Sequence, residues 1–426
     1  MCGPHRTVTT AVLPELWASP EATVARISES RRRDQLDDTG HLYRESDLDL
    51  IADLGVAASR YPVLWEHVEP RGPGERRFAW ADRRLHGLID RGVEPIVTLL
   101  HHGSGPYWTN LFDPSFATHF AEYAASVARR YPWVKRWNPI NEPLTTARFS
   151  TLYGAWYPNR VFDHGAFGRA VINQVTAILR AMERISDVIP DARFMLTEDL
   201  QSFTAGHESR ETYVAHKRER MYLSCELLQG RVVPGHPMHA YLVEDGGIAA
   251  AELLALSRRS RPPDLMGWDY YPNSERWLGR DGTHETNLPL VDVAPSRLNM
   301  RRLLRNAYAR LGVPIALAEV HVIGNERERA RWMLQRLDDA LTCAAAGVPI
   351  VAFGAWAAFG LLDWTSLLCA EDQIKEDGVY TFAGKDGIPQ STLVAGTLRE
   401  LARGRIPDKP DELGWWERMS RAPVLA

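Results

Sequence analysis

The sequence has few cysteines and no long apolar run. Its four cysteines, Cys2, Cys225, Cys343 and Cys369, are far apart, and no two have the spacing of a zinc site or a redox pair. This usage fits the reducing cytoplasm, where we expect the protein to be located. No stretch approaches the roughly 18 uninterrupted apolar residues of a membrane span, and residues 1–13 lack the apolar core of an ordinary signal peptide. We therefore expect neither a membrane protein nor a secreted one.

The net charge is also low, at −4 for 426 residues. Basic clusters at 31–33, 217–220 and 301–305 are short and are bordered by acidic or apolar residues. Such clusters are typical of solvated helix faces, so we expect no nucleic-acid partner. Hydrophobic residues make up 45% of the chain and charged residues 24%, which is enough apolar material for a large core and argues against disorder.

Four segments with a helical amphipathic pattern end in Gly-Val and continue into apolar residues. The glycines are Gly55, Gly92, Gly312 and Gly347. A glycine just past a helix end can adopt the left-handed conformation, and a β-branched residue suits the start of a strand. These joints, with similar segments that lack them, predict eight strands near residues 12–18, 56–65, 94–101, 134–141, 192–199, 264–271, 313–320 and 348–356.

Strands that alternate with helices predict a parallel sheet, and eight such units favour an α/β fold closed into a (β/α)8 TIM barrel. The alternative is a doubly wound open sheet, but no Gly-x-Gly-x-x-Gly turn follows the first strand. No linker rich in Pro, Gly or Ser divides the chain, so we expect residues 1–426 to form a single barrel domain. The long intervals 200–262 and 272–300 predict loop insertions at the C-terminal face of the barrel.

Polar and aromatic side chains follow the predicted strands at their carboxyl ends, where the active site of such a barrel lies. In chain order they are Arg60, His101, His102, Asn141, Glu142, Glu198, Asp199, Asp269, Tyr271, Glu319, His321 and Trp356. Glycosidic-bond cleavage requires two carboxyl groups across one pocket, one to protonate the leaving oxygen and one to attack the anomeric carbon. Glu142 as general acid/base and Glu319 as nucleophile are the natural pair, whereas Glu198 and Asp199 are interpreted as loop acids.

The predicted electrostatics suit this pair of acids. A cation such as Arg60 near Glu319 would keep the nucleophile ionised, and the charge of Glu319 would raise the pKa of Glu142. Asn141 is placed to donate to a sugar hydroxyl beside the reacting carbon. A separation of about 5 to 5.5 Å between the two carboxyl groups would predict retention of configuration.

Six segments along nearly the whole chain resemble, in order, those of the family 1 glycoside hydrolases. They are 60–70, 98–102, 137–143, 267–271, 318–320 and the pair 355–356 and 363–364. Asn141-Glu142-Pro143 resembles the acid/base motif of the family, and Ala318-Glu319-Val320 stands where its nucleophile motif is expected. The resemblance implies a retaining, β-glucosidase-like enzyme that acts on a small-molecule glycoside.

The resemblance also implies roles for other residues of the predicted site. Tyr271 shares a strand face with Asp269 and is our choice for the hydroxyl that supports the nucleophile. Asp363-Trp364 is similar to the Glu-Trp pair that grips the outer hydroxyls of the sugar in this family. The predicted substrate-binding residues are His101, His102, Trp356, Asp363, Trp364, Asp269 and Glu21.

The chain departs from the family at several of these positions. The sugar-gripping glutamine of the family falls near Ala25, whose methyl group cannot hydrogen-bond, and Glu21 is the residue that could replace it. Glu-Trp has become Asp363-Trp364, the tryptophan after the strand-three histidine is His102, and the nucleophile motif continues as Val320-His321. We therefore expect the sugar to be a deoxy or otherwise modified one.

Two other functions remain open at this point. A transglycosidase would transfer the sugar from the same covalent intermediate to an alcohol, whereas a non-catalytic sugar-binding barrel would keep only the fold. The intact Glu142, Glu319 and Arg60 argue against the second. Adjacent His101 and His102 cannot both point into one pocket from a regular strand, so we expect no metal and no cofactor. A homodimer is one assembly that the sequence leaves open.

Overall fold

The computed structural model describes residues 13–278 and 299–420. Eight parallel strands close into a barrel, with the first strand paired to both the last and the second. In chain order they are β1 (Glu15–Ala18), β4 (Ala58–Pro62), β5 (Glu94–His101), β6 (Arg136–Asn141), β7 (Arg193–Asp199), β9 (Leu265–Tyr270), β11 (Ile315–Val320) and β12 (Ile350–Ala355). Each coincides with a predicted strand, so the (β/α)8 fold is confirmed. Cys2 lies outside the described residues.

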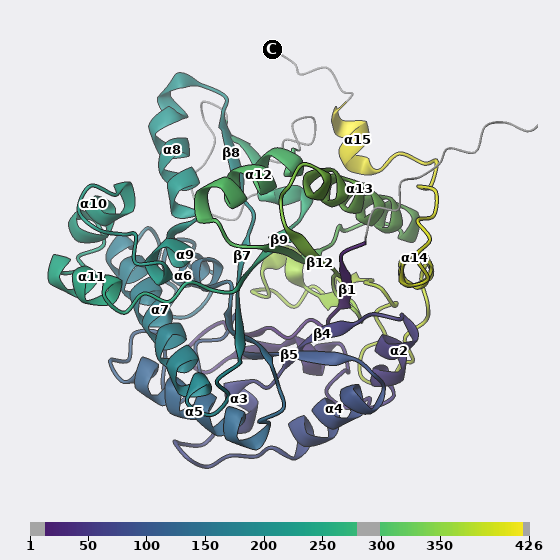
Figure 1. Cartoon of the computed structure of the whole chain (residues 1–426), viewed down its shortest axis with the longest axis horizontal. Coiled ribbons are helices and arrows are strands. Elements are labelled where there is room, and N and C mark those ends of the chain that lie inside the picture. The colour runs from purple at the N-terminus through teal and green to yellow at the C-terminus, as the bar shows by residue number, and fades with distance from the viewer. Residues whose placement is uncertain (1–12, 279–298, 421–426) are drawn as a thin grey trace, which may run out of the picture.

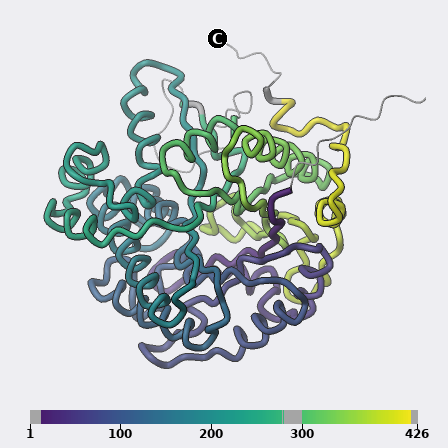
Figure 2. Tube along the Cα trace, in the orientation of Figure 1, coloured from purple at the N-terminus to yellow at the C-terminus, as the bar shows by residue number. Residues whose placement is uncertain are grey.

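Helices surround the strands, and the chain colour runs once around this ring from purple to yellow (Figures 1 and 2). The longer helices are α2 (Asp47–Asp53), α4 (Ala79–Asp90), α5 (Phe116–Arg130), α6 (Pro143–Thr151), α7 (His164–Ser186), α12 (Met300–Leu311), α13 (Glu326–Ala345) and α14 (Leu393–Ala402). The shorter ones are α1 (Gln35–Asp38), α3 (Trp65–Val68), α9 (Leu223–Leu228) and α15 (Trp415–Ser420). No helix among the described residues is both long and apolar enough to cross a membrane.

The Gly-Val joints are confirmed as helix-to-strand transitions. Gly55, Gly92, Gly312 and Gly347 have φ values of 70°, 74°, 68° and 88°, in the left-handed region that a side chain disfavours. Each follows the end of α2, α4, α12 or α13, and the next barrel strand begins two or three residues later. The predicted turn chemistry therefore sets four of the seven crossovers between barrel strands.

The amino-terminal end of the barrel is filled by side chains. Trp17, Ile96 and Met195 pack there with small alanines. Arg136 of β6 joins β1 and β5, with Nη2 donating to Glu15 at 2.8 Å and to Glu94 at 2.7 Å. This end is a packed core, which leaves the carboxyl ends of the strands for function.

Extra elements follow β7 and β9 at the carboxyl ends, as the two long intervals predicted. They are β8 (Ser202–Ala205), α8 (Glu211–Arg220), α10 (Pro237–Glu244), α11 (Ala250–Ser257) and β10 (Glu275–Leu278). β8 and β10 pair in parallel outside the barrel, and α8 stands beside them in Figure 1. Residues 279–298 of the second interval lie outside the described part of the chain.

Two small hairpins complete this face. β2 (Val24–Arg26) pairs with β3 (Arg32–Asp34), and β13 (Leu361–Leu362) pairs with β14 (Lys375–Glu376). Two of the basic clusters also differ from the expected solvated faces, because Lys217 and Arg220 are buried as well as Arg33. Arg33 is buried rather than solvated because it pairs with Asp38 and Asp363.

Gly354 in β12 tests how closely two barrel strands approach. A Cβ at this position would lie 2.4 Å from the carbonyl oxygen of Ala318 in β11, so Gly354→Ala should lower the free energy of unfolding by about 1–3 kcal/mol. Gly396 in α14 is the matched control, because its Cβ would meet no atom within 4 Å. Gly396→Ala should raise stability by about 0.5–1 kcal/mol. Urea unfolding followed by circular dichroism measures both, and equal shifts would contradict the close approach.

Candidate active site

A cavity of about 600 Å³ lies at the carboxyl ends of the barrel strands. Both predicted catalytic acids line it, with Glu142 only 5% exposed and Glu319 only 3% exposed. Among the predicted residues, the cavity wall also contains Glu21, His102, Tyr271, Trp356 and Trp364. The barrel therefore brings residues from both ends of the chain to one enclosed space.

The two acids are positioned in different ways. Glu319 is part of β11 and is paired in register with Asp269 of β9. Glu142 follows β6 directly and has a left-handed backbone, with φ 42°, after which Pro143 begins α6. Proline suits the first turn of a helix because backbone N–H groups there have no intrahelical acceptor, so the N–H that proline lacks is not missed. The acid is thus held between a strand end and a helix start.

Arg60 of β4 joins the two catalytic strands through one buried guanidinium. Its Nη1 donates to Asn141 Oδ1, and its Nη2 donates to Glu319 Oε1. The hydroxyl of Tyr271 donates to the other oxygen, Glu319 Oε2. Burial lowers the pKa of Arg60, but the charges of Glu319 and Asp269 raise it, and the net shift is upward, so Arg60 keeps its charge. Glu319 therefore has two donors suited to an anion.

Glu142 has the opposite electrostatic environment. Burial, and then the charge of Glu319, raise its pKa well above the usual range, with smaller effects from Asp199 and Glu198. His102 Nε2 lies 3.3 Å from Glu142 Oε2, and burial with the charge of Arg60 lowers the pKa of His102 to about 3. A neutral histidine does not favour ionisation of the acid. One carboxyl group of the pair thus has a raised pKa, and the other accepts from a buried guanidinium.

His102 lines the cavity and His101 does not, which agrees with the expectation that the adjacent histidines cannot both point into it. β5 ends at His101, and His102 has φ 55°, which breaks the alternation of a regular strand. Their ring centroids lie 5.0 Å apart, and Asn141 Nδ2 lies 3.1 Å from His101 Nε2. Burial and Arg60 hold the pKa of His101 well below its usual value, so it accepts as a neutral ring.

Glu21 lines the cavity, whereas Ala25 is buried against Trp156 and Leu368. The carboxyl group of Glu21 accepts from Thr23 N at 2.8 Å and from Trp356 Nε1 at 3.2 Å. Its Oε1 lies 3.8 Å from His101 Nε2. Burial, then the charge of Glu319, raise the pKa of Glu21 to about 7.

Comparison with protein families agrees with this geometry. Residues 16–272 match the family model for glycosyl hydrolase family 1. The chain belongs to this family. β-Glucosidase A of Thermotoga maritima is 22% identical over 393 residues, which cover 82% of this chain and 84% of that protein. A 6-phospho-β-glucosidase of Dickeya chrysanthemi is 29% identical over 402 residues, which cover 84% and 83%.

Solved structures show the same fold for this family 1 enzyme. The family 1 β-glucosidase from Thermotoga maritima superposes with a TM-score of 0.76 at 18% identity, covering 93% of this chain and 100% of that one. A complex of a Thermotoga maritima β-glucosidase with castanospermine gives a TM-score of 0.77 at 17% identity, covering 93% and 99%. The barrel is therefore shared at low sequence identity.

Asp363 and Asp269 do not line the cavity, so their predicted contact with the sugar is corrected. Asp363 is fully buried, and it accepts from Arg33 Nη2 at 3.1 Å and from Ile374 N at 2.8 Å. Its neighbour Trp364 does line the cavity. Asp269 is also fully buried, and burial with the charges of Glu319 and Glu142 raises its pKa well above the usual range.

Several cavity residues were not predicted. Thr145, Arg148 and Phe149 lie on one face of α6, and Glu376 comes from β14. The helical spacing of 145, 148 and 149 directly after the acid/base was a usable signal. No sequence pattern connects Glu376 to His321, whose Nε2 lies 3.5 Å from it.

Glu198 is a buried structural acid, so its interpretation as a loop acid was wrong. Its Oε1 accepts from Leu144 N at 3.0 Å and from Ser224 Oγ at 2.7 Å, which fixes the start of α6. Asp199, by contrast, lines the cavity.

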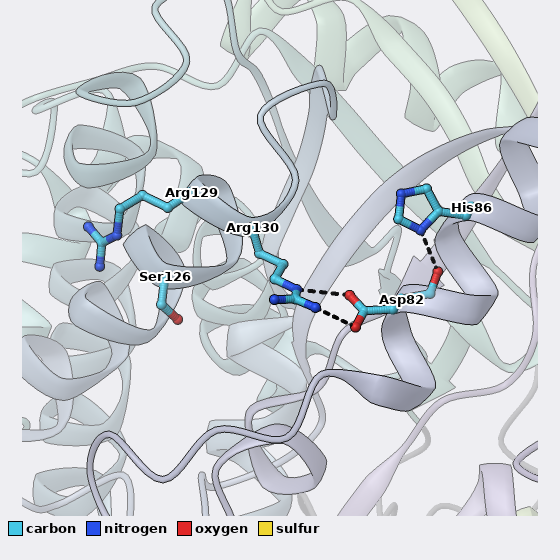
Figure 3. Close-up of a pocket in the computed structure, with 5 residues that line it drawn as sticks. All are labelled: Asp82, His86, Ser126, Arg129 and Arg130. Carbon is cyan, nitrogen blue, oxygen red and sulfur yellow. Dashed lines mark hydrogen bonds and ion pairs between the residues drawn. The ribbon is translucent and has the colours of Figure 1, made fainter.

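A second depression lies on the outer helices α4 and α5 (Figure 3). Its groups engage one another, since Arg130 donates to both carboxylate oxygens of Asp82 and His86 Nδ1 lies 2.8 Å from the carbonyl oxygen of Asp82. This depression contains a single carboxyl group, that of Asp82, and no tryptophan or tyrosine. It therefore lacks the two facing acids that the barrel cavity has.

Glu198 predicts a pH-dependent stability. Burial raises its pKa to about 8, so between the usual glutamate value and pH 8 the unfolded chain loses a proton that the folded chain keeps. Stability should therefore fall as pH rises from 5 to 8. Glu198→Gln should flatten this fall by on the order of a few kcal/mol. Thermal unfolding across this range checks it, and parallel curves for both proteins would refute the assignment.

Proposed function

We propose that this family 1 enzyme is a retaining β-glycosidase that hydrolyses a β-linked sugar through a covalent glycosyl-enzyme. The observation that carries the proposal is the division of charge at one cavity. Glu319 accepts from both Arg60 and Tyr271, while Glu142 lines the same space with a raised pKa. An ionised nucleophile facing a protonated acid is the state from which such a reaction starts.

In the first step Glu319 attacks the anomeric carbon and Glu142 gives its proton to the leaving glycosidic oxygen, which departs as an alcohol. In the second step the Glu142 carboxylate takes a proton from water, and the resulting hydroxide displaces Glu319. The covalent ester removes the negative charge of Glu319, so the pKa of Glu142 falls when it must act as a base. One residue thus serves as acid and then as base.

The remaining predicted residues would bind and orient the sugar. Asn141, held by Arg60, points its Nδ2 toward His101 and is close to the acid/base. Trp356 and Trp364 supply apolar ring surface on the cavity wall. We further propose that Glu21 in the cavity wall, together with the burial of Asp363 away from the cavity, suits a deoxy or otherwise modified sugar. The single-domain organisation, the cytoplasmic location and the oligomeric state stay predictions.

Trapping the intermediate tests the proposed nucleophile. A 2-deoxy-2-fluoro-β-glycosyl fluoride slows the second step, so mass spectrometry should find one added glycosyl group on the peptide that contains Glu319. Glu319→Gln should take up no label. In Glu142→Ala, azide should restore turnover of a dinitrophenyl glycoside and yield a β-glycosyl azide, because a small anion can enter where the acid/base was. Labelling of another residue, or an α-azide, would overturn the proposal.

The glycosyl-enzyme also provides a test of the electrostatic coupling. Esterification of Glu319 removes the charge that raises the pKa of Glu142, so the pKa of Glu142 should be lower in the trapped enzyme than in the free enzyme. Carbon-13 NMR of glutamate-labelled protein measures this titration, and Glu142→Gln identifies the signal by its absence. An unchanged pKa would show that burial alone sets the protonation of the acid.

A further inference from the structure

Glu21 lines the cavity but has no role in the proposed catalytic steps. Its side chain is 3% exposed, and its oxygens accept from one backbone N–H, of Thr23, and from the indole of Trp356. Among the described residues no cation donates a hydrogen bond to it. A buried carboxylate in this position is costly unless a cation pairs with it.

The bases near Glu21 are neutral or engaged elsewhere. His101 Nε2 is 3.8 Å away, beyond hydrogen-bond range, and burial with the charge of Arg60 keeps this ring neutral. Arg60 directs its two terminal nitrogens to Asn141 and Glu319. The nearest protein groups therefore leave Glu21 without an ionic partner.

The rest of the cavity wall is acidic as well. Its carboxyl groups belong to Glu21, Glu142, Asp199, Glu319 and Glu376, and its guanidinium groups belong to Arg148 and Arg276. Arg148 lies 4.0 Å from Asp199, and His321 lies 3.5 Å from Glu376, so these bases face other acids. A cationic ligand would complement Glu21, because Arg148 and His321 face acids other than Glu21.

We propose that Glu21 selects β-glycosides of amino sugars by pairing with the protonated amine of the sugar bound at the cleavage point. This inference rests on the proposed glycosidase function and names its substrate class. An ammonium group supplies both the charge and the N–H donors that Glu21 lacks, whereas a hydroxyl supplies a donor alone. Glu21 has no hydrogen bond to Glu142 or Glu319 among the described residues. We therefore place the amine away from the reacting carbon, and C3 and C4 are the positions that the test below compares.

A panel of aryl glycosides tests the selection. The full-length enzyme is assayed with 4-nitrophenyl β-glycosides of glucose, 3-amino-3-deoxyglucose and 4-amino-4-deoxyglucose, and with the N-acetylated amino sugars. One amino glycoside should exceed the glucoside in kcat/KM by roughly 10- to 100-fold, the effect of one charge-assisted hydrogen bond to a buried group. Acetylation removes the charge and should abolish the advantage. A glucoside that equals or exceeds both amino glycosides in the native enzyme would overturn the proposal.

Two isosteric variants assign the effect to a residue. Glu21→Gln should lose the preference for the amine, whereas Glu376→Gln removes the same charge elsewhere in the cavity and should retain it. If Glu376→Gln loses the preference equally, the overall cavity charge and not Glu21 makes the selection, and the proposal fails. Should Glu21→Gln not fold, the native comparison of amine with its acetylated form still decides.

Binding without turnover separates this proposal from the glycosidase function. Calorimetry with S-linked methyl glycosides, which resist acid-assisted cleavage, should show tighter binding of the amino sugar to the native protein. An amine preference in binding without any turnover would support the role of Glu21 and reject the glycosidase. Labelling of Glu319 with no amine preference in either measurement would do the reverse.

Discussion

The proposed catalytic arrangement depends on the two hydrogen bonds that the terminal nitrogens of Arg60 donate. One donates to Asn141 and the other to Glu319, so a single buried guanidinium links β4 to β6 and to β11. Because Arg60 stays charged, Glu319 can be an anion where an unpaired carboxylate would be costly. The charge of Glu319 then helps to keep the proton on Glu142. Both carboxyl groups therefore depend on the same cation, although it contacts only one of them.

Few positive charges lie near the other acids in the site, so little offsets the burial that raises their pKa values. Asp269 and Glu142 are buried beside Glu319, and each has its pKa raised by burial first and by that charge second. Arg60 hydrogen-bonds to only one of these three acids, Glu319, which also accepts from Tyr271. Burial, and then the charge of Glu319, raise the pKa of Glu21 to about 7, so a cation that binds beside Glu21 would favour its ionised form.

The fold and the catalytic pair were predictable because they depend on local patterns and on strand ends. Gly55 and Gly312 mark helix ends by a backbone conformation that few other residues adopt, and barrel closure brings every strand end to one rim. The positions of Glu319 in β11 and of Asn141 at the end of β6 could be predicted from the strands alone, without knowing how the loops fold. Tyr271, one residue past β9, needed only the strand period to be placed near Asp269.

What the sequence could not provide depends on how the chain turns after a strand. His102 faces the site because its backbone is left-handed, with φ 55°. Asp363 lies away from the cavity because it is bound in the interior by Arg33, which is 330 positions away in the sequence. No periodic pattern encodes either event. The residues proposed to bind the sugar come mainly from such segments, while the proposed acid, the proposed nucleophile and Arg60 come from strand ends. A family member at about 20% identity can therefore keep the chemistry of the barrel and change the sugar that it accepts.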